Sequence, residues 1–131
     1  MLYTKCILFP IEQIDGVRVS IMSRHTLNDG ITPDLRITKR SYDLWLQEFA
    51  PPSNLIGSYY QKRILWEEFE LMYKVFLSEP IKAAAVRILA EQALIKDITL
   101  LCIEKTAEKC HRRLFAEQCL LYSPRLNIIH K

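Results

Sequence analysis

One short segment near the C-terminal end of the chain carries most of the side chains that could do chemistry. Within eleven positions it holds two thiols, a carboxylate, an imidazole and a guanidinium, on Cys102, Glu104, Cys110, His111 and Arg112. Thiolates act as nucleophiles or metal ligands, imidazole transfers protons or binds metals, and guanidinium binds phosphates and carboxylates. The segment is therefore the first candidate for a binding or catalytic site.

Binding of an anion is the first of four possible roles. Cys110, His111 and Arg112 fall in the predicted first turns of a helix, where unpaired backbone N–H groups and the helix dipole attract negative charge. Arg112 could hold a phosphate or carboxylate with both arms of its guanidinium, helped by His111 and by Arg24 from a distant segment. The ligand would be a nucleotide or another phosphoester.

The other three roles use the same side chains differently. Cys102, Cys110 and His111 could bind zinc, with Glu104 as a fourth ligand, although their spacing matches no standard zinc motif. Cys110 could be a nucleophile with a low pKa, with His111 or Glu104 as its base. Because neighbouring residues in a helix point about 100° apart, His111 is poorly placed to activate Cys110 directly. Alternatively, the two cysteines are buried in the core and Arg112 forms a structural salt bridge.

The predicted secondary structure places this segment where a strand is followed by a helix. Residues 98–103 form an apolar run typical of a strand buried on both faces, and Thr106 can cap a helix that continues to about Tyr122. Cys102 then lies at the carboxyl end of a central strand. In open α/β sheets, ligands bind at these strand ends.

The remaining pattern predicts one α/β domain over residues 1–131. Strands alternate with amphipathic helices, which favours a three-layer domain with a small, mostly parallel sheet flanked by helices. The direction of the first two strands stays open, because the link between them is short for a parallel crossover. We predict strands at 3–9, 17–22 and 126–130, helices at 42–50, 62–77 and 80–94, and a long polar loop at 25–41.

Composition excludes several classes of protein. The chain has 131 residues and three glycines, so it has no glycine-rich loop of the Walker or dinucleotide type. A net charge of +3 does not by itself indicate a nucleic-acid partner. No apolar run is long enough to span a membrane, and the N-terminus does not read as a signal peptide. The four cysteines form no CxxC pair, which indicates a reduced, cytoplasmic protein with free or metal-bound thiols.

Several motifs in order along the chain resemble one known family. They are Ser23-Arg24, the 42–46 segment YDLWL, the 66–69 segment WEEF, the 100–105 segment LLCIEK and the 110–114 segment CHRRL. Together they resemble the domain of unknown function 488 family of small prokaryotic proteins. The resemblance implies an α/β fold with a parallel-type sheet and no established biochemical activity. It also implies a group of functional positions, which here are Ser23, Arg24, Glu104, Cys110, His111 and Arg112.

The chain departs from this family near Arg24. Many relatives have glycine after the arginine and some have aspartate before it, whereas this chain has His25 after it and Met22-Ser23 before it. A tight turn and carboxylate chemistry are therefore not expected at that point.

Taken together, the residues predict binding of an anionic or phosphorylated small ligand, or of a nucleic-acid end, at the carboxyl ends of the strands. A clamp made by Arg24 and Arg112 would hold the anion. The alternatives are a thiol- or metal-dependent enzyme using Cys110 and His111, and a non-catalytic interaction module with residues 55–60 as an exposed patch. No cofactor is firmly implied, and the oligomeric state stays open.

Overall fold

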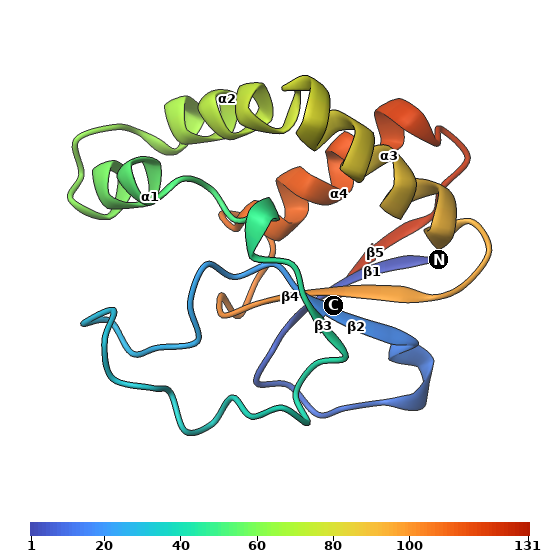
Figure 1. The fold of residues 1–131 in the computed structure, drawn as a ribbon, viewed down its shortest axis with the longest axis horizontal. Helices are drawn as coiled ribbons and strands as arrows, with labels where there is room; N and C mark the ends of the chain where they lie inside the picture. The colour runs from blue at the N-terminus through green and yellow to red at the C-terminus, as the bar shows by residue number, and fades with distance from the viewer.

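The protein is built on a five-stranded, all-parallel sheet. A computed structural model describes residues 1–131 and gives the strand order β3-β2-β4-β1-β5 (Figure 1). Both β1 and β2 pair with β4 in parallel, which settles the direction of the first two strands. The bounds are β1 Leu2–Cys6, β2 Val17–Ser20, β3 Leu44–Trp45, β4 Ile98–Cys102 and β5 Ile128–His130.

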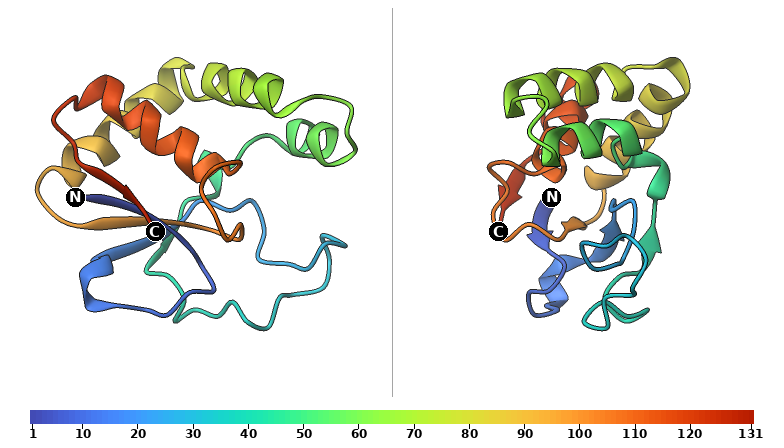
Figure 2. Two further views of the ribbon diagram at one scale, coloured as in Figure 1. Left: turned by 180° about the vertical axis from the view of Figure 1, so that it is seen from behind. Right: turned by 90° about the vertical axis from the view of Figure 1, so that its left-hand side faces the viewer.

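All four helices lie on one side of the sheet, and irregular chain covers the other side (Figures 1 and 2). The helices are α1 Ser53–Tyr60, α2 Trp66–Leu77, α3 Pro80–Ala93 and α4 His111–Tyr122. The opposite layer consists of the β1–β2 link, which includes the 3-10 helix Gln13–Asp15, and the long β2–β3 link. The predicted α/β class and parallel sheet are thus confirmed, with one of the two flanking layers non-helical. None of the helices is both long and apolar enough to cross a membrane.

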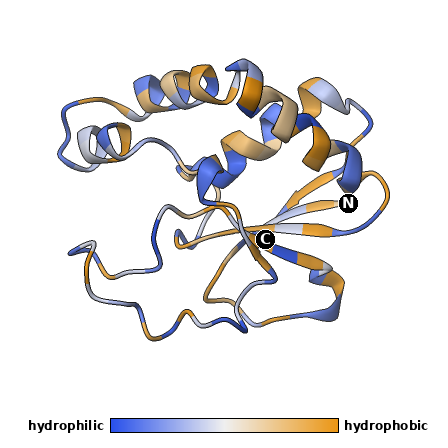
Figure 3. Cartoon of the chain, viewed as in Figure 1, coloured by the Kyte–Doolittle hydropathy of each residue, from blue (hydrophilic) through white to orange (hydrophobic).

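The main hydrophobic core lies between the sheet and the helices. Alternate strand residues such as Leu2, Val19 and Leu100 are buried in it, as expected for a strand whose side chains point to the two faces in turn. α2 contributes Phe69, Tyr73 and Leu77, which are four residues apart and share one face of the helix. Figure 3 shows hydrophobic residues running through the strands and the helices that cover them.

The non-helical face of the sheet is held by buried charges instead of apolar packing alone. The Lys5 ammonium lies 3.0 Å from the Asp15 carboxylate, which also pairs with Arg18, and all three side chains are buried. Arg18 Nε donates to the Ser41 carbonyl at 2.8 Å. This bond attaches the end of the long β2–β3 link to the sheet, so that the link lies across its face.

Gly16 makes the turn into β2 possible. Its φ of 62° lies in the region that favours glycine, and a Cβ there would lie 2.1 Å from the Asp97 carbonyl oxygen. The next residue, Val17, donates its N–H to the same oxygen at 3.0 Å. The turn thereby sets the register in which β2 pairs with β4.

The prediction of a helix over residues 42–50 is wrong. The structure instead has the short edge strand β3, followed by the 3-10 helix Gln47–Phe49. The pairing of β3 with β2, and the bond from Trp45 Nε1 to the Met22 carbonyl at 2.7 Å, outweigh the local helical spacing of aromatic residues. Tertiary pairing also explains why Trp45 stacks on His25 with ring centroids 3.8 Å apart.

Two other helix boundaries differ from prediction. α1 was not predicted, and the predicted 62–77 helix begins only at Trp66, because Lys62 has a φ of 59° and ends the preceding turn. The last long helix begins at His111 with Cys110 at its N-cap, so Thr106 does not cap it. Residues 103–109 form a loop, which carries Glu104 away from the strand. The helix at 80–94 and the strand at 98–103 are confirmed to within two residues.

Candidate functional site

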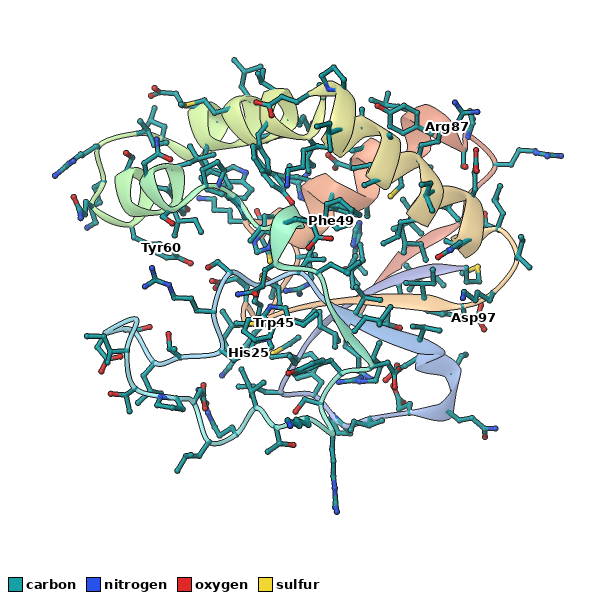
Figure 4. All side chains as sticks on the ribbon, in the orientation of Figure 1. His25, Trp45, Phe49, Tyr60, Arg87 and Asp97 are labelled. Carbon is teal, nitrogen blue, oxygen red and sulfur yellow. The ribbon has the colours of Figure 1, made fainter.

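A pocket lies at the carboxyl ends of β2 and β4. It has a volume of about 130 Å³, and its wall includes Cys102 at the end of β4 and Cys110 and His111 at the start of α4. Ser23 and Arg24 line it from the segment that follows β2. Figure 4 shows the end of the molecule where the strands finish, marked by Tyr60, opposite the end marked by Asp97. The predicted location at the strand ends is therefore where the structure has a cavity.

His111 is held in one orientation by a backbone carbonyl. Its Nε2 lies 2.8 Å from the oxygen of Ile21, at the end of β2. Because a carbonyl oxygen only accepts hydrogen bonds, Nε2 is the donor in this bond, and in the matching neutral tautomer Nδ1 is the acceptor. The Tyr73 ring meets the imidazole edge-on, with centroids 5.7 Å apart. The ring is thus positioned by β2 and α2 as well as by its own helix.

Cys102, and not only Cys110, lies beside this imidazole. Cys102 Sγ is 3.5 Å from His111 Nδ1 and 3.7 Å from Nε2, so the sulfur lies alongside the ring. The two sulfurs and the imidazole nitrogen all lie within 4.8 Å of one another. The structure therefore brings the three predicted metal-ligand candidates together, from β4 and from the start of α4.

Cys110 does not have the electrostatic setting of an activated thiol. Burial raises its pKa well above the usual value, and the neighbouring Cys102 raises it further, while His111 and Arg112 lower it by less. The expectation of a low thiol pKa at this helix N-terminus is therefore not met for Cys110 in the metal-free chain.

Arg112 is buried next to the pocket but does not line it. Its Nη1 donates to the Glu104 carbonyl at 2.7 Å and to Cys110 Sγ at 3.4 Å. Its side chain is fully buried, and Nε and Nη2 have no hydrogen-bond partner. Arg112 thus ties the β4–α4 loop to the helix, and it does not share a pocket with Arg24.

Arg24 and Ser23 instead connect the small pocket to a larger one. The second pocket has a volume of about 570 Å³, and four residues line both cavities: Ser23, Arg24, Ile56 and Tyr60. Arg24 is exposed, and its Nη1 makes a single hydrogen bond of 3.3 Å to the Gly30 carbonyl. The rest of the larger pocket is lined by the polar residues Thr26, Asn28 and Ser53 together with Leu27 and two glycines.

Tyr60 is a site residue that the sequence analysis missed. Its hydroxyl donates to Glu104 Oε1 at 2.9 Å, which joins the end of α1 to the β4–α4 loop beside the pocket. Partial desolvation of the hydroxyl, together with the charge of Glu104 and the hydrogen bond to it, raises the pKa of Tyr60, so the hydroxyl stays protonated and remains a donor. No motif marks this residue, because its role depends on contact with a loop 44 residues away.

The 55–60 segment is not the exposed apolar patch that an interaction module would need. It forms most of α1, where Leu55 is buried and Tyr59 packs against the aromatic rings of Trp66 and Phe69. Tyr60 is the exception, with 65% of its surface exposed. The segment therefore serves mainly to form one wall of the pocket.

The fold and the site define a parallel α/β domain with a ligand-sized pocket at its strand ends and a thiol–imidazole cluster in the pocket wall. All four cysteines are free. Residues 2–122 match the model of the family described as "Active DUF488-N3 subclade", and the chain belongs to this family. The matched region includes every residue of the cluster and ends before β5. No curated protein and no solved structure matches the chain.

Proposed function

We propose that the protein binds an anionic small ligand, such as a phosphorylated compound, in the pocket at the carboxyl ends of β2 and β4. Arg24 is the observation that carries this proposal. It lines both connected cavities, and a single 3.3 Å hydrogen bond to a backbone carbonyl is the only partner its guanidinium has there. A guanidinium in this state has donors free for a phosphate or carboxylate.

Two further features of the pocket support the binding of an anion. Lys109 lines the small cavity and forms no salt bridge, so two cationic side chains face Glu104 as the one acidic side chain there. The amino end of α4 also borders the cavity through Cys110 and His111, and no side chain caps its first turn. The partial positive charge of a helix N-terminus adds to that of Arg24 and Lys109.

The polar side chains in the wall of the larger cavity indicate which other groups the ligand carries. Ser23, Thr26, Asn28 and Ser53 offer hydroxyl and amide groups to the hydroxyls of a sugar or to the edge of a base. A nucleotide or sugar phosphate fits this combination, with its phosphate near Arg24. A phosphorylated nucleic-acid end would present the same groups.

Calorimetry with a panel of nucleotides, sugar phosphates and pyrophosphate tests the proposal. We expect at least one of these compounds to bind the wild-type protein. Arg24→Ala should lower the affinity for that compound by about tenfold or more, the loss typical of a charged hydrogen bond. Titrations with the chelated, metal-free protein keep this test separate from any metal binding.

Arg87→Ala is the matched control for Arg24→Ala. Arg87 lies on the outer side of α3 and pairs with Glu91 of the same helix, far from the pocket (Figure 4). Equal affinity in the two variants would rule out the anion site at Arg24, as would a panel in which no anion binds.

Thiol chemistry at Cys102 is the second candidate. It is favoured by the sulfur's position 3.5 Å from Nδ1 of His111, and by the family's description as active. Such a thiol would transfer its proton to His111. We expect iodoacetamide to modify Cys102 much faster than Cys119, whose pKa burial raises to about 12. Peptide mass spectrometry measures the rate of modification at each sulfur, and equal rates would exclude Cys102 as a nucleophile.

A further inference from the structure

We propose that Cys102, Cys110 and His111 bind a zinc-class divalent cation, with a fourth coordination position open to the pocket. Thiolate sulfur and imidazole nitrogen are the ligands that zinc prefers in proteins. Three such atoms lie within 4.8 Å of one another, and all three residues line the pocket. The proposal concerns the same pocket as the anion site but does not depend on anion binding.

One of the distances between ligand atoms already matches a tetrahedral metal. Bonds of about 2.3 Å to sulfur and about 2.0–2.1 Å to nitrogen place neighbouring sulfur and nitrogen ligands about 3.5 Å apart. Cys102 Sγ and His111 Nδ1 are separated by 3.5 Å. Because the sulfur also lies 3.7 Å from Nε2, the imidazole has to turn its Nδ1 toward the two sulfurs when a metal binds.

The second shell is the one that metal ligands usually have. A metal-binding histidine donates its other N–H to a carbonyl or carboxylate, which fixes the ring and leaves one nitrogen for the metal. In the present ring orientation the Ile21 carbonyl accepts from Nε2 at 2.8 Å, and the turn of the ring on metal binding has to keep this oxygen as the acceptor. Arg112 Nη1 donates to Cys110 Sγ at 3.4 Å, an arrangement that favours the thiolate a metal needs.

Arg112 itself supports an anionic sulfur beside it. Its guanidinium is fully buried, two of its nitrogens have no partner, and its polar contacts are the Glu104 carbonyl and Cys110 Sγ. A buried charge without an anionic neighbour is costly. A metal-bound Cys110 thiolate supplies that neighbour.

With three protein ligands, the proposed metal keeps a fourth coordination position open, as in catalytic sites. Structural zinc sites use four protein ligands, whereas catalytic sites use three and keep one position for water or substrate. The three ligands come from the end of β4 and the start of α4, and the pocket lies in front of them. Glu104 also lines the pocket, but its carboxylate already accepts a hydrogen bond from Tyr60. A small molecule in the pocket would therefore contact the metal directly.

Cobalt titration of the reduced, chelator-treated full chain tests this site. Co²⁺ bound to two thiolates and one imidazole gives visible ligand-field bands and a thiolate-to-cobalt band in the near ultraviolet. We expect both to saturate at one equivalent and to disappear when zinc is added. Cys102→Ser, Cys110→Ser and His111→Ala should each weaken cobalt binding by at least the roughly 10–100-fold that loss of an outer-shell partner costs, since each removes a direct ligand.

Cys6→Ser and Cys119→Ser are the matched controls. Both cysteines are free and buried like the two proposed ligands, but Cys6 Sγ contacts the Ile103 carbonyl and Cys119 lies in the main core. Both variants should give the wild-type cobalt spectrum. If they lose it as Cys102→Ser does, the effect comes from disturbing the fold and the assignment is wrong.

Measurements on wild-type protein keep the proposal testable even if a ligand variant fails to fold. One equivalent of zinc should raise the melting temperature and slow modification of Cys102 and Cys110 by N-ethylmaleimide. Absence of the cobalt bands together with unchanged thiol modification would overturn the metal site. Arg24→Ala should bind cobalt like wild type, so failure of the anion site and failure of the metal site give different results.

Discussion

Two glycine-to-alanine substitutions should change stability in opposite directions. Gly16 has φ 62° and ψ −133°, a conformation that costs other residues about 1–3 kcal/mol. An alanine Cβ would also lie 2.1 Å from the Asp97 carbonyl oxygen, which accepts the hydrogen bond from Val17 that begins the β2–β4 pairing. Loss of that bond adds about 0.5–1.5 kcal/mol.

The unfolded state reduces this cost only in part. Alanine restricts the unfolded chain more than glycine does, and the lower entropy of the unfolded state stabilises the folded protein by about 0.4–1 kcal/mol. We therefore expect Gly16→Ala to lower the free energy of unfolding by about 0.5–4 kcal/mol. At about 3–5 °C per kcal/mol for a domain of this size, the melting temperature falls by roughly 2–20 °C.

Gly57→Ala is the control with the opposite sign. Gly57 lies inside α1, where an added Cβ meets nothing within 4 Å. Alanine is more favourable than glycine in a helix by about 0.8–1.0 kcal/mol, so this variant should be slightly more stable than wild type.

Urea unfolding followed by circular dichroism measures both variants with one method. Equal m-values would show that the change lies in stability and not in the extent of unfolding. If Gly16→Ala were as stable as Gly57→Ala, the turn into β2 would not have the geometry described, and the argument for the β2–β4 register would fail.

Three further predictions concern the site and its surroundings. Arg112→Ala should lower the free energy of unfolding by about 1–3 kcal/mol in thermal melts, since it removes the bond to the Glu104 carbonyl and leaves a cavity, whereas Arg113→Ala should cost less than about 1 kcal/mol. Burial lowers the pKa of His25, so the unfolded chain binds this proton at a higher pH than the folded one. Stability should therefore be full above about pH 6.5 and fall as the pH drops below it, with a smaller slope in His25→Gln. Tyr60→Phe should leave the melting temperature within about 2–4 °C of wild type and speed cysteine modification in the pocket, because the Glu104 bond is lost.

The sequence predicted where the Cys102–Arg112 cluster lies in the fold, because that position follows from backbone topology. An apolar run ending at Cys102, followed by a helix, places the cluster at the carboxyl end of a central strand in any parallel sheet. The mostly parallel sheet is predicted from the alternation of strands and helices, although β1, β2 and β3 follow one another without an α-helix between them and the sequence leaves the direction of the first two open. Both inferences use local patterns, and the structure confirms the fold they predict.

What the sequence could not predict depends on contacts between distant segments. The 42–50 segment has helical spacing of its aromatic residues, yet it pairs with β2 because Trp45 bonds to Met22 across 23 residues. Tyr60 reaches Glu104 across 44 residues. Propensity and periodicity describe neighbours along the chain, so neither interaction leaves a local signal.

The Cys110-His111-Arg112 element shows how one short motif divides into separate roles. Cys110 is the N-cap of α4 and has extended backbone angles, so its sulfur can lie near the His111 imidazole. His111 and Arg112 are both helical and point about 100° apart, so Arg112 cannot act on the same ligand from the same direction. His111 faces β2 and bonds to Ile21, Cys110 lies in the pocket wall beside Cys102, and Arg112 turns toward the Glu104 carbonyl.

This division changes how a loss of function at Arg112 should be interpreted. Because its guanidinium contacts Cys110 and the loop that carries Glu104, substitution would move both pocket residues even if the ligand never touches the arginine. A true anion-binding arginine should lose affinity without losing stability, as expected for Arg24, which makes one hydrogen bond at the surface. Measuring both quantities for both arginines therefore separates a residue that binds the ligand from one that positions the residues around it.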